Sequence, residues 1–205
     1  VLGGAKVSDK IGAIEQLMPK ADAILIGGAM AYTFVKALGH SVGTSRVEED
    51  RVKDAHRMIE QAANTGVDLH LPVDHVCSTA FTEDAGDIEV FDDEIRDGYM
   101  GLDIGPKTQI KFASVISGAK TIVWNGPMGV FEWSPFRVGT KMVGTAIADA
   151  TASGATTIVG GGDSAAAVDE FRLGDRMSHV STGGGASLQM LEGRPFKALE
   201  LIEDA

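Results

Sequence analysis

Short apolar runs recur along the chain, and most of them end in glycine. Runs of this kind are typical of strands that are buried on both faces of a sheet. Glycine directly after such a run allows the sharp turn that leads from a strand into a helix. We predict strands at residues 23–26, 67–73, 121–124, 156–159 and 179–181, and residues 1–4 have the pattern of a strand end.

Three segments between these strands show apolar residues at helical spacing. The first begins at a capping box, residues 45–48, and ends before Gly66. The second spans residues 106–117, and the third begins at Ser134, which precedes a proline, and is closed by Gly154. The residues expected to face the core are Val52, Ala55, Ile59 and Ala62 in the first helix, Ile110, Ala113 and Ile116 in the second, and Val143, Ile147 and Ala150 in the third.

The alternation of strands and helices predicts an α/β fold with a three-layer α/β/α, Rossmann-like parallel sheet. No linker divides the chain, so we expect residues 1–205 to form one domain. In open parallel sheets, ligands bind beyond the carboxyl ends of the strands. Because the glycine clusters fall at those ends, the sequence predicts a binding site there.

Composition excludes some classes of partner. The chain has 205 residues, 26 of them glycine, and a net charge of −11. The acid-rich stretch at residues 83–97 is expected to be a solvated surface, and no basic face is available for nucleic acid. The apolar runs are too short to span a membrane, and no signal peptide is visible.

The cysteine content and the first residues of the chain give expectations about its cellular compartment and about whether it is part of a longer protein. The single cysteine, Cys77, cannot form an internal disulfide, which favours a reducing, cytoplasmic compartment. We expect a monomer. The chain opens on a strand end without an initial methionine, so we expect it to be part of a longer protein.

The strongest candidate for phosphate binding is the sequence Thr-Ile-Val-Gly-Gly-Gly-Asp-Ser at residues 157–164. Its glycines let a ligand approach the backbone closely, and free N–H groups at a helix start attract an anion. Asp163 is suited to hold Mg²⁺ between phosphates, and Ser164 can add a hydroxyl. The alternative is a tight turn in which Asp163 only caps the helix.

A second candidate is the sequence Gly-Gly-Ala-Lys-Val-Ser-Asp-Lys at residues 3–10. If a helix starts here, Lys6 and Lys10 share one face of it. Two ammonium groups that converge repel each other unless an anion joins them, and phosphate is a suitable anion. The alternative is a solvated helix start with incidental charges.

Two further segments have the composition of binding loops. In residues 124–132, Val130 and Phe131 can pack beside a base, and Glu132 can accept hydrogen bonds from ribose hydroxyls; a rigid buried loop is an equal alternative. Residues 181–188 contain a second glycine run before a helix, which is a second phosphate site or a flexible loop.

Two other nucleotide motifs receive little support. Gly160, Gly162 and Ala165 match the G-x-G-x-x-A pattern of dinucleotide sites, but no acid stands at the end of the next strand to bind a ribose. The P-loop pattern G-x-x-x-x-G-K-[ST] is absent from the sequence.

Taken together, six segments resemble the phosphoglycerate kinase family. They occur in the family's order and cover nearly the whole chain, so their combination is far more specific than any one of them. The matching segments are LGGAKVSDKI (residues 2–11), ILIGGAMAYTFVKALG (24–39), GLDIGPKT (101–108), VWNGPMGVFE (123–132), IVGGGDSAAAV (158–168) and HVSTGGGASL (179–188).

The resemblance implies a reversible phosphoryl transfer in glycolysis. The acyl phosphate of 1,3-bisphosphoglycerate would pass to Mg-ADP, giving ATP and 3-phosphoglycerate. The chain would be the C-terminal, nucleotide-binding domain, with ATP or ADP as partner and Mg²⁺ as cofactor. The N-terminal domain that binds the phosphoglycerate is absent from this chain.

Carried over by position, the resemblance also implies roles for single residues. Lys6 would stabilise the phosphoryl group in flight, Asp163 would take the metal, and Glu132 would hold the ribose. The helix start at residues 183–185 would face the transferred phosphate. The catalytic set would be Lys6, Lys10, Gly161 and Gly184. The nucleotide-binding set would be Gly4, Lys6, Lys10, Gly28, Gly105, Asn125, Val130, Glu132, Gly161, Gly162, Asp163 and Ser164.

The sequence departs from the family pattern in two places. Ala29 stands where a third glycine is common, which would narrow the base pocket, and residues 192–196 differ from the usual ending. Without the other domain, the chain is expected to bind nucleotide and turn over poorly. A stand-alone nucleotide sensor and a dinucleotide oxidoreductase are the alternatives.

Overall fold

Five parallel strands form two groups, and the first residues of the chain join them. The computed structural model describes residues 1–181, 183 and 189–193. Leu2 bridges Ile26 on one side and Asn125 on the other, both in parallel. The order across the sheet is therefore β2, β1, residues 1–3, β6, β7, β8. The strands are β1 (Ala23–Leu25), β2 (Asp68–His70), β6 (Thr121–Trp124), β7 (Thr156–Gly160) and β8 (His179–Ser181).

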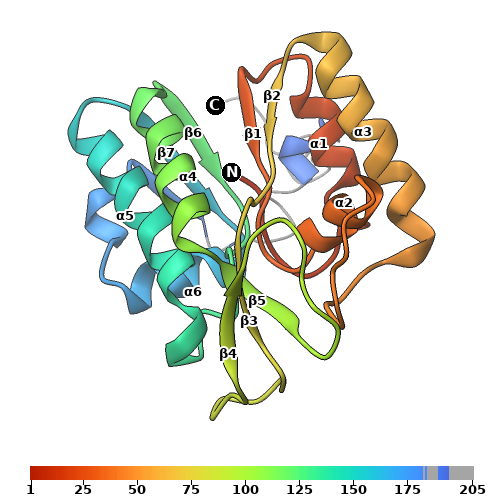
Figure 1. Cartoon of the computed structure of the whole chain (residues 1–205). Coiled ribbons are helices and arrows are strands. Elements are labelled where there is room, and N and C mark those ends of the chain that lie inside the picture. The colour runs from red at the N-terminus through yellow and green to blue at the C-terminus, as the bar shows by residue number, and fades with distance from the viewer. Residues whose placement is uncertain (182, 184–188, 194–205) are drawn as a thin grey trace, which may run out of the picture.

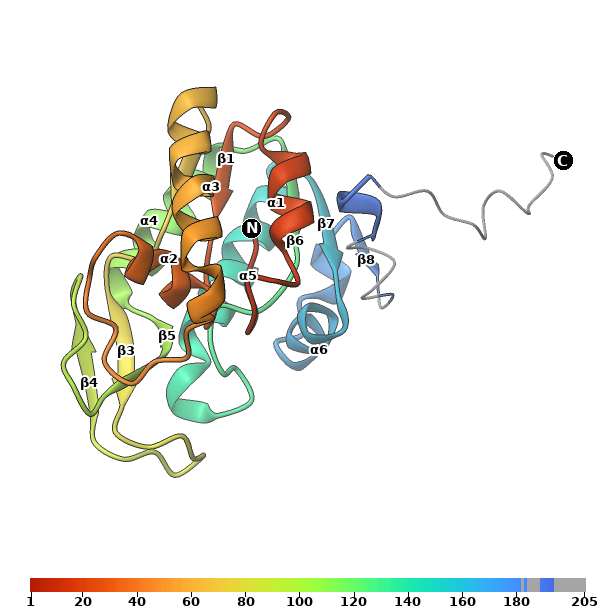
Figure 2. The same cartoon turned by 90° about the vertical axis from the view of Figure 1, so that its right-hand side faces the viewer.

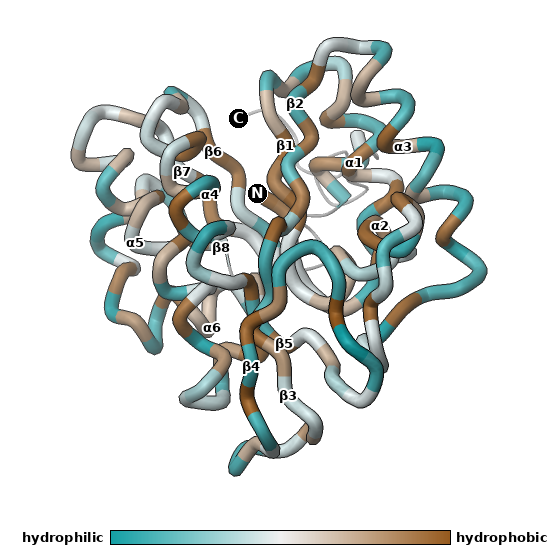
Figure 3. The backbone as a smooth tube through the Cα atoms, in the orientation of Figure 1, coloured by the Kyte–Doolittle hydropathy of each residue, from teal (hydrophilic) through white to brown (hydrophobic). Residues whose placement is uncertain are grey.

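Helices cover both faces of this sheet (Figure 1). Successive residues of β1 point to opposite faces: Ile24 packs in a core with Phe34 and Met58, whereas Leu25 packs in a second core with Phe112. Figure 3 shows the matching pattern, with apolar residues along the central strands and polar residues outside. The three-layer prediction is confirmed. The helices are α1 (Ile11–Leu17), α2 (Ala31–Ala37) and α3 (Val52–Thr65) on one face, α4 (Pro106–Gly118) and α5 (Val138–Ala152) on the other, and α6 (Gly162–Glu170) against β7 and β8.

A small antiparallel sheet was not predicted. It has the order β4–β3–β5 and projects from the rest of the molecule in both Figure 1 and Figure 2. β4 lies within the acid-rich stretch and three of its four residues are exposed, so the predicted solvated surface is present but carries a strand. Its alternation covers too few residues to stand out among the acids. The strands are β3 (His75–Ser78), β4 (Ile88–Phe91) and β5 (Met100–Ile104).

The predicted capping box is wrong. Residues 45–48 are not helical, and α3 begins only after a short 3₁₀ turn, η1 (Glu49–Arg51). The Ser45 hydroxyl accepts a hydrogen bond from the backbone N–H of Gly101 instead, at 2.9 Å. The predicted end of this helix is confirmed, because Gly66 follows it with a φ of 76°.

Other boundaries shift by small amounts. Ile110 points into solvent, with 71% exposed, and Phe112 takes its place in the core with Ile116. Ser134 starts a 3₁₀ turn, η2 (Ser134–Phe136), and not α5 itself, whose predicted core residues are buried. A further 3₁₀ turn, η3 (Gly174–Arg176), precedes β8. None of the helices in the described part of the chain has the length and apolar character that a membrane span needs.

Candidate phosphate-binding site

The carboxyl ends of the central strands enclose a cavity of about 270 Å³. Residues that follow the N-terminal strand, β6 and β7 contribute to it, as expected for a parallel sheet. Its walls therefore unite the two lysines and the glycine-rich helix start that the sequence marked as separate candidates. The lining residues are Gly3, Gly4, Ala5, Lys6, Asp9, Lys10, Asn125, Gly126, Gly161, Gly162, Asp163 and Ser164.

Glycines let the strand ends approach each other at backbone distance. A Cβ on Gly126, whose φ is 101°, would lie 2.2 Å from the carbonyl oxygen of Gly3. A Cβ on Gly3 would lie 2.1 Å from the carbonyl oxygen of Pro127, and one on Gly28 would lie 2.5 Å from the backbone of Gly4. Side chains at these points would push the strand ends apart and open the floor of the cavity.

The start of α6 faces the cavity with free N–H groups. Gly161 precedes the helix with φ 106° and ψ 142°, a conformation that essentially only glycine adopts. The first intrahelical bond runs from Ala165 N to Gly161 O, at 2.9 Å. Among the described residues, no acceptor lies against the N–H groups of residues 162–164. These groups and the helix dipole favour an anion.

Lys6 and Lys10 both line the cavity, although they do not share a helix face. α1 begins only at Ile11. Lys10 ends a turn that its own N–H closes by donating to Val7 O at 2.9 Å, and Lys6 directly precedes this turn. The helix that would place both lysines on one face begins after them, and both lysines nevertheless border the same cavity. Burial lowers the pKa of Lys10 to about 8, against the opposing charges of Asp9 and Asp163.

Asn125 carries a buried donor without a partner. Its side chain is 2% exposed, and Oδ1 accepts a hydrogen bond from Lys10 Nζ. Its Nδ2 has no hydrogen-bond partner among the described residues. A buried amide donor left unpaired costs about 1–3 kcal/mol. An acceptor on a ligand in this cavity would satisfy it.

Ser164 has a structural task at the same place. Its hydroxyl is fully buried and accepts a hydrogen bond of 2.6 Å from the backbone N–H of Gly126. The side chain thereby fixes the loop after β6 to the start of α6. The predicted contact between this hydroxyl and a phosphate stays a prediction.

The residues expected around the base and ribose lie outside this cavity. Gly28 packs on Gly4, and a Cβ on Gly105 would lie 2.3 Å from the carboxyl carbon of Asp74. Val130 donates its N–H to Leu102 O at 2.9 Å, and Glu132 is exposed. Their predicted nucleotide contacts stay predictions. Gly184 lies outside the described residues.

A metal at this site would need further ligands from a bound phosphate compound. No group of three or more His, Cys, Asp or Glu side chains suited to a metal ion occurs in the described part of the chain. Asp163 offers an exposed carboxylate in the first turn of α6, and Asp9 is a second exposed carboxylate on the wall of the cavity. This donor set fits Mg²⁺, which proteins usually hold by one or two carboxylates together with substrate phosphates.

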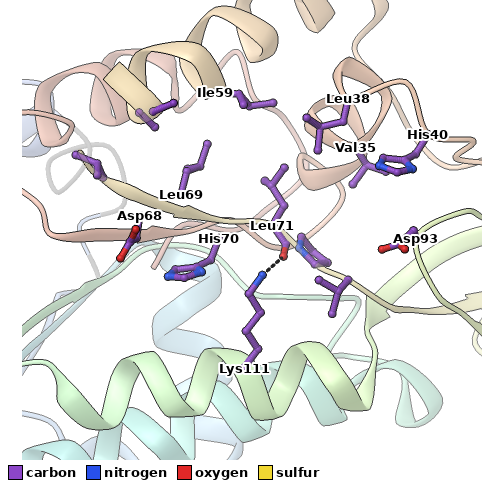
Figure 4. Close-up of a pocket in the computed structure, with 15 residues that line it drawn as sticks. Val35, Leu38, His40, Ile59, Asp68, Leu69, His70, Leu71, Asp93 and Lys111 are labelled. Carbon is purple, nitrogen blue, oxygen red and sulfur yellow. Dashed lines mark hydrogen bonds between the residues drawn. The ribbon is translucent and has the colours of Figure 1, made fainter. Parts of the chain in front are cut away.

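A larger pocket of about 430 Å³ lies at the open edge of β2 (Figure 4). Aliphatic side chains from α2 and α3 form much of its wall. Lys111 reaches it from α4, and its Nζ donates to Leu71 O at 3.3 Å. Burial lowers the pKa of His70, and the charge of Lys111 adds to the shift while Asp68 opposes it. No buried polar atom that lacks a partner belongs to this pocket's described lining, so its chemistry is less directed than that of the first cavity.

Comparison with known proteins gives a consistent result. The sequence profile described as "Phosphoglycerate kinase" matches residues 1–194. Phosphoglycerate kinase of Thermosipho africanus is 58% identical over 204 residues, which are 98% of this chain and 50% of that protein. The enzyme of Clostridium tetani is 53% identical, over 100% of this chain and 50% of its own length. The chain thus spans about half the length of the curated relatives it matches.

Solved structures agree with the sequences. The structure of phosphoglycerate kinase from Coxiella burnetii superposes with a TM-score of 0.90 at 44% identity, covering 94% of this chain and 50% of that one. The enzyme from Pyrococcus horikoshii superposes with a TM-score of 0.82 at 33% identity, covering 97% of this chain and 50% of that one.

Proposed function

This chain belongs to the phosphoglycerate kinase family, and we propose that it is the C-terminal, nucleotide-binding half of such an enzyme. One observation carries the assignment. The cavity at the sheet's carboxyl edge combines two lysines, an unpaired amide donor and a helix N-terminus. All of these attract phosphate oxygens, and they converge on one space.

The proposed reaction is reversible phosphoryl transfer between 1,3-bisphosphoglycerate and Mg-ADP. The bond between the phosphorus and the carboxyl oxygen breaks, and a terminal oxygen of ADP forms the new bond to phosphorus. The products are 3-phosphoglycerate, which leaves as a carboxylate, and ATP. Such a transfer asks the protein for positioning and for positive charge around the spreading oxygens, and it needs no covalent nucleophile.

Within this scheme the two lysines contact different phosphate groups. Lys10 is buried and fixed on Asn125, which suits a constant contact with the nucleotide phosphates. Lys6 is exposed at the mouth of the cavity, which suits the phosphoryl group in flight. The N–H groups at the α6 start and Asn125 Nδ2 would receive the remaining phosphate oxygens.

Mg²⁺ would be held by Asp163 together with phosphate oxygens, and when bound it neutralises charge on the phosphates. The proposal retains Gly28, Gly105 and Val130 for the base and Glu132 for the ribose hydroxyls. It also retains residues 183–185, at the start of a second glycine run, for the transferred phosphate.

The second substrate would bind to a partner domain. We propose that 1,3-bisphosphoglycerate or 3-phosphoglycerate is held by an N-terminal domain, in a cytoplasmic, glycolytic enzyme. These 205 residues alone would then bind nucleotide and turn over poorly, because the partner domain would be needed to hold the acyl phosphate in line. A coupled ATP assay checks this, and ordinary turnover by the chain alone would overturn it.

The deciding experiment is calorimetric titration of the chain with Mg-ADP. We expect one-to-one binding that weakens at least tenfold in Lys10→Ala and Asp163→Ala. Lys53→Ala, which removes an exposed lysine from α3, is the matched control and should bind as the unchanged chain does. Absence of binding by a chain that circular dichroism shows to be folded would refute the assignment.

A further inference from the structure

Glu48 joins a distant loop to the turn that carries the two lysines. Its carboxylate accepts two hydrogen bonds from one residue: Ser8 N donates to Oε2 at 3.0 Å, and Ser8 Oγ donates to Oε1 at 2.6 Å. Ser8 lies midway between Lys6 and Lys10, and it is 40 residues from Glu48 in the sequence. Both carboxylate oxygens are therefore engaged on the centre of the lysine turn, residues 6–10.

The loop behind Glu48 is itself firmly attached. Glu48 N donates to the Thr33 hydroxyl in α2 at 3.2 Å. Thr44 N donates to Tyr99 O at 2.8 Å, and Gly101 N in β5 donates to the Ser45 hydroxyl at 2.9 Å. The loop that carries the carboxylate is thus attached to α2 and to the antiparallel sheet, and it can act as a fixed support.

The exposed start of the lysine turn is the part on which such a support can act. It follows Gly4, whose φ is 105° and around which an added Cβ would meet no atom within 4 Å. Ala5 and Lys6 are exposed. A short exposed segment after a glycine samples many conformations unless contacts restrain it. Val7 is buried in a core and Lys10 is held by Asn125, so these two residues anchor the turn, and the Glu48 carboxylate adds a third attachment at Ser8, between them.

Electrostatic interactions keep the Glu48 carboxylate, which clamps the lysine turn through Ser8, in its ionised form. Burial alone would raise the pKa of Glu48, but hydrogen bonds from Ser8 and Val7 and the charge of Lys6 outweigh it and lower the pKa. The carboxylate is then ionised at neutral pH and accepts hydrogen bonds with both oxygens. Charged acceptors make stronger hydrogen bonds than neutral ones.

We propose that Glu48 is a positioning residue for phosphate binding, which fixes the lysine turn through Ser8 before the nucleotide arrives. The inference rests on the proposed nucleotide site and adds to it a residue outside the cavity. A turn that is already ordered loses less conformational entropy when a ligand binds. Removing the clamp should therefore weaken nucleotide binding without removing any group that touches the nucleotide.

The test compares Mg-ADP binding by calorimetry in Glu48→Ala, Glu48→Gln and the unchanged chain. Glu48→Ala should weaken binding about five- to tenfold, which is less than the full contribution of two hydrogen bonds to a charged group because Val7 and Lys10 still anchor the turn. Glu48→Gln keeps one oxygen acceptor for Ser8 and should recover part of the loss. Glu49→Ala is the matched control, because it removes an exposed acid next in the chain whose partner, Lys36, lies on the surface. Its affinity should not change.

A double-mutant cycle separates positioning from a general loss of stability. If Glu48 acts through the lysine turn, its removal should cost less in a Lys6→Ala background than in the unchanged chain. Additive losses that follow the melting temperature would refute positioning. Ser8→Ala supplies a second route, since it removes only the hydroxyl donor and should weaken binding less than Glu48→Ala.

The outcomes separate this inference from the function on which it rests. If the unchanged chain binds Mg-ADP and folded Glu48→Ala and Ser8→Ala bind it equally well, the positioning role is wrong and the nucleotide site stands. If the unchanged, folded chain does not bind Mg-ADP, the proposed function fails and the positioning role falls with it. If Glu48→Ala does not fold, Glu48→Gln and Ser8→Ala decide the question.

Discussion

Both α4 and α6 begin with backbone N–H groups that have no partner inside the helix. At α4 a side chain of the protein accepts hydrogen bonds from them, and at α6 they are left open. At α4, Pro106 has no N–H, and the N–H groups of Lys107 and Thr108 each donate to the carboxylate of Asp74 at 2.8 Å. Asp74 is 1% exposed. At α6, by contrast, glycines replace any capping side chain, and the first N–H groups open onto the cavity.

This difference shows which helix starts are closed and which are available to a ligand. Each has a dipole and unpaired N–H groups that favour an anion. α4 receives its anion from the protein, and the start of α5 is closed as well, because Gly139 N donates to the buried carboxyl group of Asp103 at 2.6 Å. At α6 no described acidic group fills that position. A helix N-terminus indicates a binding site only when it is left open and meets other donors, as it does beside Lys10 and Asn125.

The largest expected effect is a loss of stability in Asp74→Ala, which removes the side chain that closes the start of α4. This change leaves the N–H groups of Lys107 and Thr108 without their acceptor, and the Thr108 hydroxyl keeps only the backbone carbonyl of residue 74, at 3.2 Å. Hydrogen bonds to a charged group contribute about 1.5–3 kcal/mol each, and they are not additive, so we expect a loss of about 3 kcal/mol or more. Urea unfolding measures it. A loss below about 1 kcal/mol would mean that Asp74 does not secure α4.

The next effect is acid instability around His75, which follows Asp74 in the chain. Its side chain is fully buried, and both ring nitrogens lack a partner among the described residues. Burial lowers the pKa of His75 to about 4, against the opposing charges of Asp74 and Asp93. Because the folded pKa lies below the unfolded value, the stability is present above about pH 6.5 and is lost as pH falls through 4.

The size of this loss follows from the shift in pKa. Between pH 7 and 4 it amounts to about 3 kcal/mol. In His75→Leu the free energy of unfolding should fall less steeply over this range than in the unchanged chain. His56→Leu alters an exposed histidine of α3 and serves as the control. Equal slopes for His75→Leu and the unchanged chain would show that the buried ring does not titrate with folding.

The residues around the open start of α6 were more predictable from the sequence than the residues that close the starts of α4 and α5. Lys6, Lys10, Gly161 and Asp163 stand in short segments whose composition already favours phosphate binding, and the structure brings them to one cavity. The parallel strands were predictable for the same reason, since a buried apolar run and the glycine after it are adjacent in the chain.

The closed side depends on partners that lie far apart in the chain. Asp74 meets the start of α4 over a separation of 33 residues, and Asp103 meets Gly139 over 36. Glu48 is a further example. The local sequence placed it in a capping box, but its carboxylate accepts hydrogen bonds from Ser8, 40 residues away. A local sequence pattern indicates which hydrogen bonds a side chain can accept, but the tertiary structure determines which donor lies next to it.

Gly161→Ala tests whether the open start depends on glycine. At φ 106° and ψ 142° another residue costs about 1–3 kcal/mol. Its Cβ would also lie 3.2 Å from Asn125 Nδ2, so the donor that faces the cavity would be crowded. Gly162→Ala is the control, because a Cβ there meets no atom within 4 Å, and its stability should change by less than about 1 kcal/mol. Similar unfolding midpoints for the two variants would contradict the special role of Gly161.

The smallest effect on stability, and the sharpest test of the open start, is expected in Asp163→Asn. The side chain is exposed in the first turn of α6, so the free energy of unfolding should change by less than about 0.5 kcal/mol. Nucleotide binding should respond in opposite directions with and without the metal. With Mg²⁺ the affinity for ADP should fall at least tenfold, because a metal ligand is lost. With EDTA it should stay equal or rise, because a negative charge beside the phosphates has been removed. Calorimetry in the two buffers measures both. An equal loss in both would mean that Asp163 contacts the nucleotide directly, and the α6 start would then be open to phosphate but not to a metal.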